Sequence, residues 1–373
     1  MSAKPRIIIA AIASRAYVQA AVTAGFEVIA IDAFCDVDTQ AQALQTLQVP
    51  AINGRFDADA FNVALSQIDC TDVLGMTIGA GFEAVPELLA AIPAAVNPIF
   101  NAPKVISAVK NPDNFFAFLT RIGAPHPATQ LARPSNTVAW LQKQTGGSGG
   151  AHIKPAISLD IAVDIAEKSP VYYQQICAGE PYACLFLADG KQAQVIGVHQ
   201  QWCAPSITSN SRITQPYRFG GAVSHAEITQ DIALEIDFYV QAITSHFGLR
   251  GINSLDFMLH HNAINLLEVN PRLSASLQLY SAKKGDLFTT HVQACLGELI
   301  HWPIVEKQSS AMHIIYANKT AHVPANMYWP DWCADIPQPH SEIAAGAPLC
   351  TVLASARTAK FAHKKVMQYA NAL

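Results

Sequence analysis

Residues 251–272 constrain the fold of this chain more than any other segment. Their sequence, GINSLDFMLHHNAINLLEVNPR, has the pattern of two short strands joined by the polar turn HHNA. Side chains along a strand alternate between its two faces. We therefore expect one face of the first strand to carry Ser254, Asp256 and Met258, and one face of the second to carry Leu266, Glu268 and Asn270. The segment predicts a β-hairpin with polar groups gathered on one side.

Two carboxylates of this hairpin are expected to lie opposite each other. If the turn centres near His261 and Asn262, Asp256 faces Glu268 across the strand pair. Like charges at opposed positions destabilise a sheet, so the pair calls for a cation. Carboxylate and amide oxygens suit Mg²⁺, which proteins usually hold through one or two carboxylates and substrate phosphates. The pattern predicts a metal site at Asp256, Glu268 and Asn270. The alternative is a solvated strand that ends in an Asn-Pro turn.

The composition limits the class of protein. A chain of 373 residues predicts two or three domains, and 51% apolar with 14% charged residues is a globular composition. The net charge of −4 argues against a nucleic-acid surface, and no run reaches the roughly 18 apolar residues of a membrane span. Eight cysteines without paired spacing predict free thiols in a reducing compartment. We expect a cytoplasmic protein with no nucleic-acid or membrane partner.

The first hundred residues alternate between strand and helix patterns. We expect strands at residues 6–13, 26–31 and 72–77, and helices at 15–24, 39–48, 56–67 and 83–91. Ser14 is placed to cap the first of these helices. Strands separated by helices predict a parallel sheet, whose ligands bind at the carboxyl ends of the strands. Those ends carry Ser14, Arg15, Asp32, Gly79 and Gly81. The absence of GxGxxG and GxxxxGK[ST] motifs argues against NAD-type and P-loop proteins.

The remaining chain divides at a boundary-like stretch, VNPIFNAP, at residues 96–103. Its proline and asparagine residues are typical of connections between units. We expect four units, over residues 1–103, 104–185, 186–304 and 305–373. Helices are expected at 114–121, 136–141 and 235–247, and a hairpin with an Asp-Gly turn at 184–202.

A glycine-rich loop lies between two expected strands. It consists of Gly146, Gly147, Ser148, Gly149 and Gly150. Backbone N–H groups without side chains can approach phosphate oxygens closely. Lys143, just before the loop, offers the positive charge that a phosphate needs. The loop predicts a phosphate site, with an ordinary flexible hairpin as the alternative. His152, next to the loop, is a further candidate for contact with a ligand.

The segment QQICAGEP predicts a strand followed by a loop that could hold an adenine. Backbone groups of Gln174, Gln175, Ile176 and Cys177 are candidates to recognise the edge of the base, and Gln174 or Glu180 could add polar contacts. An edge strand that ends in a turn is the alternative.

These three segments, in this order, resemble the signature of the ATP-grasp superfamily. The resemblance covers residues 100–300, and the first hundred residues are similar to the Rossmann-like domain that precedes ATP-grasp modules. It implies an α/β domain followed by a two-subdomain ATP-grasp fold of α+β class. By this resemblance, ATP lies between the subdomains. Lys143 and residues 146–150 would hold its phosphates, residues 174–177 its adenine, and Asp256, Glu268 and Asn270 two Mg²⁺ ions.

The sequence departs from the family pattern at three places. The hinge strand usually opens with Glu, where this chain has Gln174 or Gln175. The ribose-binding acid is expected where Pro181 stands, which makes Glu180 the substitute. The earlier family lysine falls near Asn114, so Lys110 or Lys104 is expected to replace it. These departures affect the nucleotide contacts and leave the expected metal site unchanged.

The resemblance implies a ligase that activates a carboxylate as an acyl phosphate and passes it to an amine. Lys143 and Arg272 would neutralise charge during catalysis. Arg272 suits bidentate binding of a phosphoryl group or carboxylate. Ser14, Arg15, Arg272 and Ser274 are expected to line the site for small-molecule acid and amine substrates. The rivals are carboxylation or thioester formation, and a nucleotide-binding protein without turnover. A homodimer is one expected use of residues 305–373.

Within the superfamily, the stretches IASRAYVQAAVTAGFEVIAIDAF and LEVNPRLSASLQLY are similar to ATP-grasp proteins of methylotrophs and methanogens. That neighbourhood includes a tyramine–glutamate ligase. The similarity implies a role in the assembly of C1-carrier cofactors such as methanofuran or methanopterin.

Overall fold

A parallel sheet forms the N-terminal part of the chain. The computed structural model describes residues 4–158, 170–205, 207–209, 212–280, 286–299, 301–302 and 308–373. Four strands pair in the order β3-β2-β1-β6. Their bounds are β1 (Arg6–Ala11), β2 (Glu27–Asp32), β3 (Gln45–Gln48) and β6 (Val73–Ile78). The side chains of β1 and β2 are almost wholly buried. The β-branched runs of this region therefore form the central strands, as the sequence predicts.

Short helices and a hairpin surround this sheet. They are α1 (Arg15–Thr23), α2 (Val37–Gln40), α3 (Ala58–Ser66), the 3₁₀ helix η1 (Pro86–Ala91), and the strands β4 (Ala51–Ile52) and β5 (Arg55–Phe56). The helix expected at residues 39–48 is wrong, because the second half of that segment is β3. Its backbone pairs with the free edge of β2, from Ile29 opposite Gln45 to Asp32 opposite Gln48. Such tertiary pairing overrides weak helix propensity.

Two consecutive helices connect the first sheet to the next part of the chain. They are α4 (Pro103–Lys110), which the sequence analysis missed, and α5 (Pro112–Arg121). Both begin with proline at the first helical position, where its missing N–H costs nothing. The Asn111 side chain accepts a hydrogen bond from the Asn114 N–H at 3.0 Å and caps α5. The break at Asn111 leaves Lys110 at the end of α4, where its side chain reaches β17 (Ala263–Asn270).

A small antiparallel sheet follows, in the order β7-β10-β8-β9. Its strands are β7 (Thr129–Gln130), β8 (Trp140–Gln144), β9 (Lys154–Pro155) and β10 (Val171–Gln175), and the 3₁₀ helix η2 (Ala156–Ser158) follows β9. The helix expected at residues 136–141 is wrong. The Asn136 side chain instead accepts a hydrogen bond from the Val138 N–H at 3.0 Å. Asparagine competes in this way for local backbone groups and favours a turn over a helix.

The largest sheet has eight strands, in the order β17-β16-β11-β12-β15-β18-β22-β20. Their bounds are β11 (Glu180–Asp189), β12 (Ala193–Cys203), β15 (Phe219–Ser224), β16 (Arg250–His260), β17 (Ala263–Asn270), β18 (Ser309–Tyr316), β20 (Cys333–Ala334) and β22 (Pro348–Ala356). There are also two small two-stranded sheets, β13 (Ile207–Ser209) with β14 (Arg212–Thr214), and β19 (Ala321–His322) with β21 (Glu342–Ile343). The boundary expected at residue 185 lies within β11, and residues 305–373 add strands to this same sheet. The four-unit division stays a prediction.

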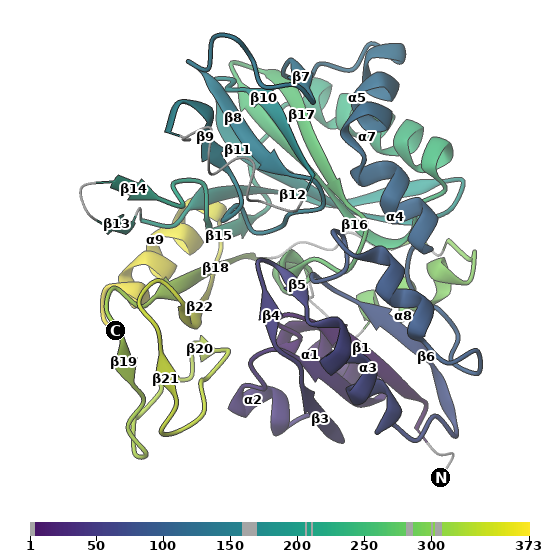
Figure 1. Ribbon diagram of the computed structural model, residues 1–373, viewed down its shortest axis with the longest axis vertical. Helices are drawn as coiled ribbons and strands as arrows, with labels where there is room; N and C mark the ends of the chain where they lie inside the picture. The colour runs from purple at the N-terminus through teal and green to yellow at the C-terminus, as the bar shows by residue number, and fades with distance from the viewer. Residues whose placement is uncertain are drawn as a thin grey trace.

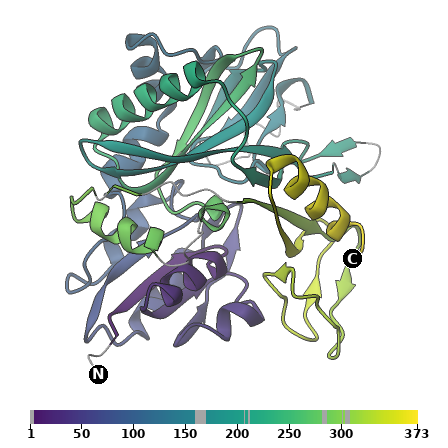
Figure 2. The same ribbon diagram turned by 180° about the vertical axis from the view of Figure 1, so that it is seen from behind.

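Helices cover the large sheet and join it to the N-terminal domain. They are α7 (Gln230–Phe247), α8 (Asp286–Cys295), α9 (Ala359–Ala370) and the 3₁₀ helix η3 (Ala275–Leu279). Helix α8 lies between the N-terminal sheet at the bottom of Figure 1 and the large sheet, as the view from behind in Figure 2 also shows. One apolar core joins α1, η3 and α8 to strands of both sheets. Among the described residues, no helix is both long and apolar enough to cross a membrane.

Candidate functional site

The hairpin of β16 and β17 brings two carboxylates opposite each other. Asp256 pairs with Glu268, and Ser254 pairs with Asn270, which confirms the expected register. A bulge then shifts the pairing, so that Phe257 faces Leu266. Leu266 therefore lies on the opposite face from Glu268, and the expectation that they share one face is wrong. The extra residue allows Leu266 to be fully buried while Glu268 turns to the site.

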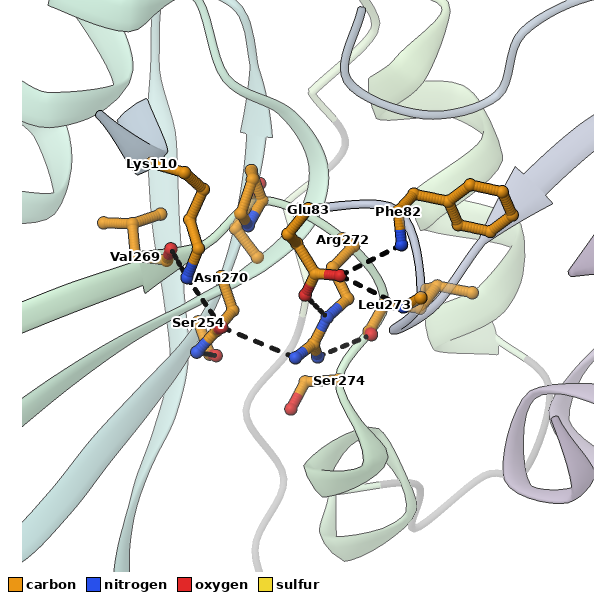
Figure 3. A network of polar contacts seen from close by, with 12 residues as sticks. Phe82, Glu83, Lys110, Ser254, Val269, Asn270, Arg272, Leu273 and Ser274 are labelled. Atoms are coloured by element: carbon orange, nitrogen blue, oxygen red, sulfur yellow. Dashed lines mark hydrogen bonds and ion pairs between the residues drawn. The ribbon is translucent and has the colours of Figure 1, made fainter. Parts of the chain in front are cut away.

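Lys110 brings a positive charge to the exposed edge of this hairpin. Its ammonium donates to the Glu268 Oε2 at 2.9 Å. It also donates to the Val269 carbonyl oxygen at 3.3 Å and to the Asn270 Oδ1 at 3.4 Å (Figure 3). Burial works against the charge of Glu268, but the ammonium groups of Lys110 and Lys143 outweigh it and hold the pKa of this carboxyl well below its usual range. The Glu268 carboxyl is therefore ionised at neutral pH.

Asp256 differs from Glu268 in its electrostatic surroundings. Burial, followed by the repulsion of Glu268, raises the pKa of Asp256. Its Oδ2 accepts a hydrogen bond from the Asn270 Nδ2 at 3.2 Å, and Asn270 also donates to the Ser254 Oγ at 3.4 Å. A second positive charge, in addition to the Lys110 ammonium, would relieve the repulsion between the Asp256 and Glu268 carboxylates.

The donor set fits a magnesium ion. Oxygens of Glu268 and Asn270 both accept hydrogen bonds from the Lys110 ammonium, so these oxygens already face a positively charged group. Within the ranges that the structure describes, no group of three or more His, Cys, Asp and Glu side chains could hold a metal unaided. A metal here would use the two carboxylates, the Asn270 amide oxygen and groups of its ligand, which is the mode Mg²⁺ prefers.

Arg272 is held at the junction with the N-terminal domain. Its Nε donates to the Glu83 Oε1 at 2.6 Å, and its other nitrogens donate to the Leu273 carbonyl oxygen at 3.1 Å and the Asn270 Oδ1 at 3.4 Å (Figure 3). Glu83 is almost fully buried and also accepts hydrogen bonds from the Gly81 and Phe82 N–H groups. Burial opposes the charge of Glu83, but Arg272 outweighs it and lowers the pKa of this carboxyl.

Sequence reasoning missed Glu83 as a site residue. It is the last residue of the glycine turn IGAGFE, which begins at the end of β6 at the carboxyl edge of the parallel sheet, and it was expected to begin a helix. Its position at the carboxyl edge of the sheet, where ligands of parallel sheets bind, could have identified it as a site residue. Tyr17 was missed as well. Its hydroxyl donates to the Leu273 carbonyl oxygen at 3.1 Å, and burial raises its pKa to about 12. Tyr17 therefore fixes the same turn that follows Arg272.

Lys143 lies on β8, three positions before the first glycine of the glycine-rich loop. It is buried and donates to the Gln174 Oε1 at 2.6 Å. Burial lowers the pKa of Lys143, although the carboxylates Glu268 and Asp256 act in the opposite direction. Gln174 is also buried and donates to the Thr129 Oγ1 at 3.2 Å. Its side chain therefore orients Lys143, and the expected contact of that side chain with adenine stays a prediction.

The rest of the expected adenine segment leaves β10 toward solvent. Gln175 and Ile176 are exposed, Cys177 is half-buried, and Glu180 is exposed at the start of β11. Glu180 pairs through its backbone with Leu259 of β16. These residues lie at one border of the region that also holds Lys143, and their roles in nucleotide binding stay predictions.

The glycine-rich loop is docked against two other parts of the chain. A Cβ on Gly146 would lie 2.4 Å from the Glu83 carbonyl oxygen, and a Cβ on Gly150 would overlap the Tyr217 carbonyl oxygen. Both glycines have positive φ angles, +73° in each case. The Phe219 N–H donates to the Gly149 carbonyl oxygen at 2.9 Å. The loop therefore closes between the N-terminal domain and β15, and Ser148 and Gly147 lie within it.

The residues expected to line a substrate site have partners within the protein. Ser14 is buried, and both its hydroxyl and its N–H donate to the Asp32 Oδ2, at 2.5 and 2.6 Å. Its side chain makes no capping bond to α1, so the expected cap is wrong. Arg15 is buried against Asp335, with an Nε to Oδ1 distance of 2.9 Å. Ser274 lies beside Arg272, and its hydroxyl contacts the Ser276 hydroxyl at 2.9 Å.

Comparisons with known proteins agree with this arrangement. Residues 113–276 match the family model described as an ATP-grasp domain. An uncharacterized protein of Methanocaldococcus jannaschii is 22% identical over 349 residues, which cover 88% of this chain and 83% of that protein.

Solved structures show the same fold over nearly the whole chain. The biotin carboxylase domain of the 2-oxoglutarate carboxylase from Hydrogenobacter thermophilus, in complex with MgADP, ADP and bicarbonate, matches with a TM-score of 0.72 at 12% identity, covering 99% of this chain and 90% of that one. The L-amino acid ligase from Bacillus licheniformis matches with a TM-score of 0.67 at 13% identity, covering 98% and 97%. Residues 113–276 are thus similar to an ATP-grasp domain, and nearly the whole chain shares the fold of these solved structures, which confirms the expected resemblance.

Proposed function

We propose that this protein is an ATP- and Mg²⁺-dependent ligase that joins a carboxylic acid to an amine through an acyl phosphate. The observation that carries the proposal is the charge arrangement around the hairpin. The carboxylates of Asp256 and Glu268 lie opposite each other. Nearby, the side chains of Lys110 and Arg272 both donate to the Asn270 Oδ1. Phosphoryl transfer to a carboxylate brings anions together, and sites for it depend on positioned positive charge.

Each side chain has a role in this chemistry. Asp256, Glu268 and Asn270 would hold Mg²⁺, which supplies charge neutralisation at the transferring phosphoryl group. Lys143 and the loop of residues 146–150 would hold the phosphates of the nucleotide. Arg272, fixed by Glu83, would orient the acid substrate with its remaining donors. The closed loop would keep water from the reactive acyl phosphate.

The amine is expected to reach the site from the N-terminal domain. Glu83 and Tyr17 border that side of Arg272, and Ser274 begins the turn that leads to η3. Ser14 and Arg15 lie further along the same sheet edge and are engaged by Asp32 and Asp335. Ser14 and Arg15 would therefore support the walls of the substrate site.

The direct test is ADP release from the full chain with pairs of acids and amines. Glutamate and tyramine belong in the screen, because of the sequence similarity to ATP-grasp proteins of methanogens and the relative in Methanocaldococcus jannaschii. Activity with this pair would support a role in C1-carrier cofactor assembly. Hydroxylamine added with the correct acid alone should trap the acyl phosphate as a hydroxamate.

The Glu268→Gln variant is expected to be inactive in this screen, and Glu298→Gln is its control. It removes one ligand charge while retaining the shape of the side chain, so ADP release should fall by about 100-fold or more in a protein that still folds. Glu298→Gln, at an exposed position, should leave turnover unchanged. Normal turnover in Glu268→Gln would contradict the metal assignment.

Carboxylation is the second candidate, favoured by the match to a biotin carboxylase domain. ADP release that depends on bicarbonate and needs no amine would identify it. A protein that binds MgATP without turnover is the third, favoured by the glutamine in place of the usual hinge acid. Thermal stabilisation by MgATP without ADP release from any acid and amine pair would support that alternative.

A further inference from the structure

A groove between three helices lies outside the nucleotide site. Helices α4, α5 and α7 pack beside one another on the right of Figure 1. Among the described residues, the groove is lined by Lys104, Val105, Ala108, Asn114, Ala117, Phe118, Arg121, His246 and Phe247. Its volume of about 520 Å³ lies within the range of roughly 300–1,000 Å³ that is typical of small-molecule sites. Lys104, one of the two expected replacements for the family lysine, lies here, whereas Lys110 contacts Glu268.

The floor of this groove is apolar and continuous with the core. The α5 residues that line it, at positions 114, 117, 118 and 121, have the spacing of one helical face. Phe118 is buried, and its ring meets that of Phe247 edge-on, with centroids 5.5 Å apart. Both side chains pack in the same core cluster as Phe115 and Leu119. The floor is therefore formed by the fold itself and does not depend on a ligand.

The rim of the groove is positively charged. Lys104 and Arg121 are exposed, and neither forms an ion pair with a carboxylate in the part of the chain that the structure describes. The His246 ring stacks on Phe118 with centroids 4.1 Å apart, and the Arg121 Nη2 donates to its Nδ1 at 3.2 Å. Partial burial, followed by the charge of Arg121, lowers the pKa of His246, so this ring is a neutral acceptor at pH 7. These contacts hold the guanidinium at the rim, and none of the described lining residues is acidic.

We propose that this groove binds a small organic anion. Its apolar body would lie on Phe118 and Phe247. Its charged group, a carboxylate, sulfonate or phosphate, would face Lys104 and Arg121, because guanidinium groups bind such oxyanions through paired hydrogen bonds. The charges favour this occupant over an apolar protein segment, which would bury two cations without a counter-ion. Helix α4 runs from the groove to Lys110 in the nucleotide site, but the inference does not require ligase activity.

Fluorescence titration of the full chain with 8-anilinonaphthalene-1-sulfonate tests the proposal. N-phenyl-1-naphthylamine, which has the same ring system without the sulfonate, is the neutral probe. The anionic probe should bind about tenfold more tightly than the neutral probe, because only the sulfonate pairs with the cations of the rim. MgADP should displace neither probe, since the groove lies outside the nucleotide site.

Substitutions separate the charge of the rim from the shape of the groove. Arg121→Gln and Lys104→Gln should each weaken the anionic probe about three- to tenfold and leave the neutral probe unchanged. Ala117→Trp, at an exposed helical position, should fill the groove and weaken both probes. Lys319→Gln, at an exposed lysine outside the groove, should bind both probes normally. Melting curves check that each variant is folded.

Three results would overturn the assignment of this groove. The first is an anionic probe that does not bind, that binds no better than the neutral one, or that Arg121→Gln and Lys104→Gln bind normally. The second is displacement of the probe by MgADP, which would place the probe in the nucleotide site. The third is a dimer in sedimentation velocity that Ala117→Trp dissociates, which would assign the groove to a contact between two copies of the chain.

Discussion

Single residues in this site are held by partners from distant parts of the chain. Arg272, at the end of the hairpin, is oriented by Glu83 from the N-terminal domain, 189 positions earlier in the chain. Both side chains are largely withdrawn from water, at 10% and 2% exposure. A buried ion pair is satisfied only while both partners are present, because removal of one leaves an uncompensated charge. The orientation of Arg272 therefore depends on Glu83.

Glu83→Gln should lower both stability and turnover. It leaves Arg272 buried without its counter-ion, which is expected to reduce the free energy of unfolding by about 3 kcal/mol. Glu87→Gln, four positions later and exposed, should change it by less than about 0.5 kcal/mol. Urea denaturation of the two variants makes the comparison. Equal stability would show that Arg272 does not need Glu83.

At the scale of elements, the glycine-rich loop is shaped by what it packs against. Gly149 and Gly150 have nearly the same φ angle, +68° and +73°. A Cβ on Gly149 would meet nothing within 4 Å, whereas a Cβ on Gly150 would overlap the Tyr217 carbonyl oxygen. The two glycines thus carry similar backbone strain and very different contacts. Only Gly150 is required for docking of the loop on the segment before β15.

This difference gives a matched pair of substitutions. Gly149→Ala should cost about 1 kcal/mol of stability through its left-handed backbone and bind MgADP normally. Gly150→Ala should displace the loop from Tyr217 and weaken MgADP at least tenfold. Melting curves and titration calorimetry on both variants give the two readouts. Equal MgADP affinity in the two variants would mean that loop docking does not contribute to nucleotide binding.

At the scale of the whole molecule, the last seventy residues connect the two ends of the chain. Strands β18 and β22 extend the large sheet. The segment after β20 forms hydrogen bonds with the N-terminal domain. The Asp38 carboxylate accepts hydrogen bonds from the Asp335 and Ile336 N–H groups at 2.9 and 3.0 Å. Arg15 joins Asp335 to Gln278 of η3. The contact therefore links the carboxyl edge of the first sheet to the turn after Arg272.

The acidic groups at this contact make stability depend on pH. Burial, followed by the charges of Asp335, Asp32 and Asp38, raises the pKa of Asp36 to about 8. The unfolded chain releases this proton near pH 4, and the folded chain retains it up to about pH 8, so the contribution of Asp36 to stability falls between these values. The melting temperature of the protein should drop between about pH 5 and about pH 8 in part for this reason.

Asp36→Asn should remove that part of the drop and raise the melting temperature at about pH 8, since asparagine carries no charge to bury and begins a helix as well as aspartate does. Asp59→Asn, at an exposed position of α3, should leave the pH profile unchanged. Differential scanning calorimetry across this range makes the comparison. A profile of Asp36→Asn parallel to that of the unaltered chain would contradict the argument.

The sequence by itself determined the features that depend on near neighbours in the chain. The hairpin with Asp256 opposite Glu268 follows from alternation and a short turn, and the central parallel strands follow from buried β-branched runs. The glycine-rich loop after Lys143 was visible for the same reason. Each of these patterns is local, so spacing alone carries the information.

Only the tertiary structure decided the features that depend on distant partners. The β2 edge made residues 45–48 a strand, and the bulge turned Leu266 into the core while Glu268 stayed in the site. The pairing of Arg272 with Glu83 and of Lys143 with Gln174 crosses 189 and 31 positions. Burial and charge balance are properties of the assembled site, and no local pattern records which side chain will supply the opposite charge.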